Sequence, residues 1–115
     1  MNTFFVTLDP MAAALTVQNE VIQGSITGEL IDMHRIDLGD GRCVLVQVFE
    51  KHYYRAGNRL TLTVTIDNAT GHTRVHTASG GGGEGLFRFD WGASESFETV
   101  AENALAPYRT GGSAR

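Results

Sequence analysis

The chain has 115 residues, of which 42 % are hydrophobic and 19 % charged, and these values predict one globular domain and exclude a disordered chain. The net charge is −4 with scattered basic residues, and no apolar run approaches the roughly 18 residues of a membrane span. We therefore expect no nucleic-acid partner and no membrane association. The single cysteine, Cys43, and an amino terminus unlike a signal peptide predict a cytoplasmic location.

The first 24 residues predict a strand followed by a helix. Phe4, Val6 and Leu8 alternate with Thr3, Phe5 and Thr7, which is typical of a short strand buried largely on both faces. Asp9 and Pro10 then form an N-cap followed by proline at the first helical position. We expect a helix over 10–23 that ends at Gly24.

The middle of the chain predicts an antiparallel meander. Its four expected strands cover residues 25–38, 42–55, 59–67 and 72–79. Asp40-Gly41 is typical of a type I′ hairpin turn, and Gly57-Asn58 and Asn68–Gly71 supply the next two turns.

The carboxyl-terminal part predicts a loop and a second helix. The glycine-rich run 80–85 predicts a flexible loop that could cover a ligand, followed by an extended piece at 86–91. Ser94 is a plausible N-cap for a helix that Pro107 ends. The expected fold is α+β, a two-layer sandwich with two helices on one face of an antiparallel sheet. We expect one domain over 1–109 and a flexible tail at 110–115.

The expected turns also predict strand registers. They place His34 beside Gln47, Phe49 opposite Ile66 and Val64 opposite Val75. The helix-covered side would then hold several polar groups, which need partners or a cavity: Asp32, His34, Gln47, Lys51 and Tyr53. The alternative is a slipped register or a bulge that sends these groups to solvent.

Two functions follow from this arrangement. The favoured one is non-catalytic binding of a small ligand or a protein partner, with contacts from His34, Gln47, Tyr53, Gly82, Gly83 and Trp91. The alternative is a small enzyme that uses His34 with Asp32 or Lys51 in acid-base chemistry. A purely structural interaction domain is a third possibility.

Three further patterns bear on partners and cofactors. Val44, Val46 and Val48 would form an apolar face, through which the chain could form a homodimer. His72 and His76 lie about 13 Å apart on a strand, too far to share one metal ion. The G-x-G-x-x-G spacing at 80–85 follows an expected strand, but no helix opens directly after Gly85 and no βαβ unit surrounds it, as a dinucleotide site requires. We therefore expect no metal and no cofactor.

Two segments carry a resemblance to a known family. The segment 57–64 and the segment 80–97, with its Phe-Arg-Phe-Asp-Trp-Gly-Ala core, resemble a family of small uncharacterised bacterial proteins. The resemblance extends to Tyr108 and implies a single stand-alone domain. It implies no particular activity and no site residues.

Overall fold

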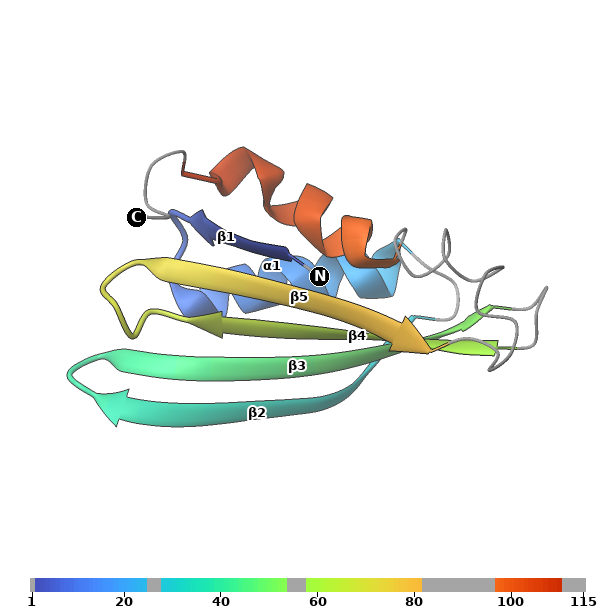
Figure 1. Ribbon diagram of the computed structural model, residues 1–115, viewed down its shortest axis with the longest axis horizontal. Helices are drawn as coiled ribbons and strands as arrows, with labels where there is room; N and C mark the ends of the chain where they lie inside the picture. Colours follow the sequence, from blue (N-terminus) through green and yellow to red (C-terminus); the bar gives the residue numbers. More distant parts are fainter. Residues whose placement is uncertain (1, 25–27, 54–57, 82–96, 111–115) are drawn as a thin grey trace.

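The fold is a five-stranded antiparallel sheet with two helices (Figure 1). The computed structural model describes residues 2–24, 28–53, 58–81 and 97–110. Its elements are β1 (Asn2–Val6), α1 (Pro10–Gln23), β2 (Glu29–Gly39), β3 (Arg42–Tyr53), β4 (Asn58–Asp67), β5 (Thr73–Gly81), helical residues 97–105 and a 3₁₀ turn at Ala106–Tyr108. The strand order β1-β5-β4-β3-β2 confirms the predicted α+β class.

Both helices pack on one face of the sheet, which we call the inner face; the opposite one is the outer face (Figure 1). The largest fully buried side chains are Phe49 from β3 and Phe97 from the carboxyl-terminal helix. The apolar residues of β4 alternate with threonines, and their side chains form the centre of the core: Leu60, Leu62, Val64 and Ile66. None of the helices among the described residues is long and apolar enough to cross a membrane.

Helix α1 begins and ends where the sequence predicts. The Asp9 carboxylate accepts a hydrogen bond from the Ala12 backbone N–H at 2.8 Å, and Pro10 occupies the first turn. At the other end, the Gly24 N–H donates to the carbonyl of Glu20. The helix is amphipathic, because its buried positions recur at helical spacing: Pro10, Ala13, Ala14, Val17 and Val21.

The Asp9 cap gives a first testable prediction. Asp9→Ala removes the acceptor of the Ala12 N–H, so we expect it to lower the free energy of unfolding by about 1 kcal/mol. Asp9→Asn keeps an acceptor and is expected to change it by only a few tenths of that amount. Urea denaturation of both variants measures the difference. Equal stabilities of the two variants would contradict the capping role.

The register of β2 differs from the prediction by one residue. The predicted turn forms as expected: Gly39 pairs with Arg42, and Asp40 and Gly41 have φ of +57° and +78°. A bulge between Asp37 and Gly39 then shifts the ladder by one residue. Asp32 and His34 consequently pair with Val48 and Val46 and lie on the outer face. Their predicted inner position is wrong, and the bulge alternative is correct for them. A second bulge at Ile31 returns Leu30 to the inner face, opposite Phe49.

The other two predicted registers are also wrong, but they keep the correct faces. Phe49 pairs with Leu62 rather than Ile66, because Asn58 already belongs to β4 and pairs with Tyr53. Val64 pairs with Thr77 rather than Val75, because β5 begins at Thr73. These shifts are of four and two residues, and an even shift leaves each side chain on its predicted face. Strand β5 also runs two residues further than predicted, into the glycine-rich run.

The two edges of the sheet differ. The carboxyl-terminal segment covers β1: the Thr7 N–H donates to the Tyr108 carbonyl at 2.8 Å, and the Thr110 N–H donates to the Phe5 carbonyl at 3.0 Å. Val6 and Arg109 form an antiparallel bridge between these two bonds. Strand β2 forms the other edge and pairs only with β3 among the described strands.

Candidate functional site

The residues predicted to contact a ligand do not share one pocket. His34 lies on the outer face, whereas Gln47 lies on the inner face opposite Val64. Successive side chains of a strand point to opposite faces, so these two predicted contacts cannot line the same cavity. The remaining predicted contacts lie outside the described residues: Gly82, Gly83, Trp91 and the side chain of Tyr53.

Neither predicted acid-base pair is joined by a contact among the described residues. Lys51 lies on the inner side, where its ammonium is 5.8 Å from the centre of the Phe97 ring. His34 is on the outer face, so the sheet separates it from Lys51. Asp32 shares the outer face with His34, but both side chains are exposed, and no hydrogen bond joins these two described groups.

Gln47 is buried in the core and connects the sheet to α1. Its side-chain amide donates to the Ala14 carbonyl at 2.9 Å, while Oε1 has no hydrogen-bond partner. The buried hydroxyl of Thr77 also lacks a partner, and it lies across Val64 from Gln47 on the inner face. These atoms make the inner face polar near its middle.

A second group of polar residues lies on the outer face, where no element among the described residues covers the sheet. We call it the outer polar cluster, and it consists of Thr3, Thr65, Asp67, Arg74 and His76. Strand pairing brings these residues together: His76 of β5 lies between Thr3 of β1 and Thr65 of β4. The next row of the same face holds Asp67 opposite Arg74.

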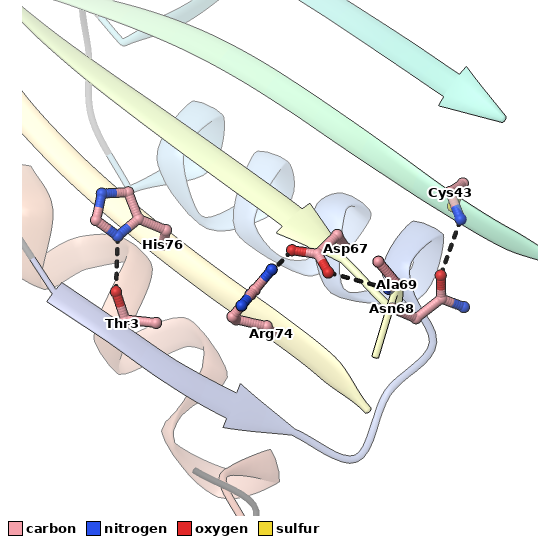
Figure 2. A network of polar contacts seen from close by, with 7 residues as sticks. All are labelled: Thr3, Cys43, Asp67, Asn68, Ala69, Arg74 and His76. Carbon is pink, nitrogen blue, oxygen red and sulfur yellow. Dashed lines mark hydrogen bonds and ion pairs between the residues drawn. The ribbon is translucent and has the colours of Figure 1, made fainter. Parts of the chain in front are cut away.

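Asp67 fixes the position of Arg74 (Figure 2). One carboxylate oxygen accepts a hydrogen bond from Arg74 Nε at 3.1 Å, and the other accepts from the Ala69 N–H at 3.0 Å. The Asp67 side chain is 8 % exposed and that of Arg74 is 41 % exposed. The carboxylate therefore holds the guanidinium by its Nε edge, while the guanidinium remains accessible from solvent.

The turn beside Asp67 is also held by side-chain hydrogen bonds (Figure 2). Asn68 accepts from the Cys43 N–H at 2.9 Å and donates to the Gly41 carbonyl at 3.2 Å. These bonds join the β4–β5 turn to the β2–β3 hairpin. The backbone next to Asp67 is therefore held by both the β4–β5 turn and the β2–β3 hairpin.

His76 and Thr3 form the other contact of the cluster. The Thr3 hydroxyl lies 2.7 Å from His76 Nδ1 (Figure 2). A nucleophile of the serine-hydrolase type would need a carboxylate that orients the other ring nitrogen. Asp67 does not supply it, because its two oxygens bind Arg74 and Ala69. Asp67 therefore does not complete a catalytic triad with Thr3 and His76.

The cluster lines an open depression of about 360 Å³. This volume is near the lower end of small-molecule sites. Its groups offer the guanidinium of Arg74, the imidazole of His76 and the hydroxyl of Thr65, while the Thr3 hydroxyl contacts His76 Nδ1. Such donors match an oxyanion. Within the described ranges, no three side chains of His, Cys, Asp and Glu lie close enough to hold a metal ion.

Comparison with known proteins gives the family of the chain. Residues 3–109 match a family of unknown function, DUF6054. The chain belongs to DUF6054. The predicted membership of a family without an assigned function is thereby confirmed. No curated protein and no solved structure matches this DUF6054 member.

The outer polar cluster of this DUF6054 member was missed by sequence analysis. The alternation of β5 is a sequence signal that places Arg74 and His76 on one face. The predicted register, with Val64 opposite Val75, would place Thr65 opposite Arg74, whereas Thr65 pairs with His76 and Asp67 pairs with Arg74. Thr3 had no sequence signal, because its position depends on the pairing of β1 with the distant strand β5.

Proposed function

We propose that the protein is a non-catalytic binding module and that it binds a small oxyanion in the depression of the outer polar cluster. The observation that carries the proposal is the pair of nitrogen-rich side chains, Arg74 and His76, beside the Thr65 hydroxyl in one depression. This concentration of donors stands on a chain whose net charge is −4. A cytoplasmic location fits the single, buried and free Cys43.

The chemistry of the proposed contact follows from how Asp67 holds Arg74. Because the bond to Asp67 uses Nε, the terminal amino groups remain for two oxygens of a carboxylate or phosphate group. His76 supplies one further ring N–H through Nε2 when its Nδ1 accepts from Thr3. The hydroxyl of Thr65 completes the donors at the same row of the sheet.

Substitution of Arg74 tests the proposal. With inorganic phosphate and acetate as probes at low ionic strength, we expect Arg74→Gln to raise the Kd by at least about tenfold, because a charged hydrogen-bond donor is lost. Calorimetry or NMR titration measures the Kd. Arg74→Lys keeps a positive charge near Asp67 but lacks the planar guanidinium fork. Its Kd is therefore expected to lie between those of the wild type and of Arg74→Gln.

Arg59 provides a matched control. It lies on the same outer face, paired with His52, and its guanidinium is 3.6 Å from the Glu50 carboxylate. Arg59→Gln removes the same charge from the same face outside the depression, so the Kd should not change. Equal effects of Arg59→Gln and Arg74→Gln, or no saturable binding to the wild type, would refute the proposed site.

Self-association is a second candidate function, and a specific observation favours it. The valines of β3, Val44, Val46 and Val48, lie on the outer face and are only half-buried. Ile36 of β2 continues the row of Val44 and is 43 % exposed. We call these four residues the apolar band, and burial of such a band by a second copy of the chain would be favourable.

A further inference from the structure

The open edge of the sheet, strand β2, has the features of a pairing surface. It is 11 residues long and pairs only with β3 among the described strands. The exposed large apolar side chains of the strand are Ile31, Ile36 and Leu38, at 47 %, 43 % and 50 %. The β1 edge is instead covered by residues 108–110. An uncovered edge strand presents unpaired backbone N–H and C=O groups and can pair with another strand, and the charged side chains of β2 then decide which strand fits.

The charges of β2 suit a second β2. When two identical antiparallel strands pair about a two-fold axis at one residue, positions equally far before and after it lie opposite each other. An axis at Ile36 puts Arg35 of each copy opposite Asp37 of the other, and Ile36 opposite itself. These three positions lie in the regular stretch 32–37 between the two bulges. Opposite charges and apolar pairs at facing positions both stabilise a sheet.

The neighbouring registers lack this complementarity. An axis at Arg35 places Arg35 opposite itself, and an axis at Asp37 places Asp37 opposite itself; like charges at facing positions destabilise a sheet. An axis at His34 leaves Arg35 opposite Met33. An axis at Met33 pairs Asp32 with the imidazole of His34 inside the same regular stretch, but it leaves Arg35 without a facing carboxylate. Pairing about Ile36 is therefore the register that the charges favour.

The same register continues the apolar band. Ile36 pairs with Val44 within one chain. With Ile36 opposite its own copy, the outer face would carry the uninterrupted row Val44, Ile36, Ile36 and Val44 across the two chains. Within each chain Arg35 also binds Asp37 at 2.9 Å, and this hydrogen bond raises the pKa of Arg35 above its ordinary value. Both partners are highly exposed, so the contact leaves them accessible to a second chain.

We propose that β2 pairs antiparallel with β2 of a second copy about Ile36, which joins two five-stranded sheets into one. The inference rests on self-association, the second candidate function, and joins the two chains at the β2 edge rather than by burial of the whole apolar band. It is independent of oxyanion binding, because the outer polar cluster lies on β1, β4 and β5.

Charge reversal tests the proposed register. Arg35→Asp places the new carboxylate opposite Asp37 of the other copy, and Asp37→Arg places the new guanidinium opposite Arg35 of the other copy. Each substitution creates this like-charge pair twice in the dimer. We expect each single variant to weaken the dimer by about tenfold or more in sedimentation experiments. The double variant should restore the wild-type dissociation constant, because it exchanges the charges of both pairs.

Mixing the two single variants separates pairing between chains from the contact within one chain. Equal amounts of Arg35→Asp and Asp37→Arg should form a heterodimer as stable as the wild-type dimer, although neither variant restores its own Arg35–Asp37 contact. A monomeric wild type, single variants that dimerise normally, or a mixture without heterodimer would each overturn the inference.

A control variant distinguishes this geometry from stacking of two outer faces. Val46→Thr keeps the side-chain volume and makes the centre of the apolar band polar. It should leave an edge-paired dimer within about twofold of the wild type, because Val46 lies one strand away from the proposed junction. Strong weakening by Val46→Thr, with no effect of charge reversal, would overturn edge pairing while leaving self-association intact.

Discussion

Replacing Gln47 by alanine is expected to lower the free energy of unfolding by about 3 kcal/mol, whereas replacing it by methionine should leave it unchanged or raise it by about 1 kcal/mol. The alanine variant leaves a cavity in the middle of the inner face, where Gln47 is fully buried. It also removes the hydrogen bond to the Ala14 carbonyl.

Methionine fills the same space without the polar atoms. The Oε1 atom of Gln47 is buried and has no hydrogen-bond partner, and such an atom costs about 1–3 kcal/mol. The Ala14 carbonyl lies inside α1, where it also accepts the bond of the helix. Chemical denaturation of both variants measures the two effects. A loss of more than about 2 kcal/mol in Gln47→Met would show that Oε1 has a partner in solution, such as a buried water.

Gly81→Ala is the second substitution with a large expected effect, a loss of about 3 kcal/mol of unfolding free energy. Gly81 ends β5 with φ of +97°, a backbone conformation that residues other than glycine rarely adopt. An added Cβ would also lie 2.4 Å from the Arg59 carbonyl oxygen. The backbone of β4 or β5 must therefore move to accept alanine.

Gly80 is the matched control for this substitution. Its φ is not in the positive region, and an added Cβ would meet only the Thr61 hydroxyl at 3.8 Å. Gly80→Ala is expected to raise the unfolding free energy by about 0.5 kcal/mol, because alanine restricts the unfolded chain. Thermal melts of the two variants compare neighbouring residues directly. Similar melting temperatures would mean that the end of β5 is not held in this conformation.

The parts of the fold that local signals determine could be predicted from the sequence. The Asp9-Pro10 pair marks the start of α1, and Asp40-Gly41 forms the turn with two positive φ angles. The alternation of β4 also places its leucines and its threonines on opposite faces, because the period of a strand is fixed at two residues.

The candidate sites could not be predicted because they depend on non-local geometry. One extra residue at Leu38 moves Asp32 and His34 to the other face, and the adjacent Gly39, with φ of +87°, is equally expected in a hairpin turn and does not by itself mark a bulge. The outer polar cluster needs β1 to pair with β5, two strands separated by most of the chain. Thr3 and His76 are 73 residues apart, so no local pattern connects them.

The most direct test of the proposed binding function is an NMR titration of the wild-type protein with inorganic phosphate, followed through the backbone amide signals. We expect saturable shifts centred on the amides of Thr65, Asp67, Arg74 and His76, with little change along β2. Absence of saturable shifts in the outer polar cluster, or shifts centred elsewhere on the sheet, would contradict the proposal.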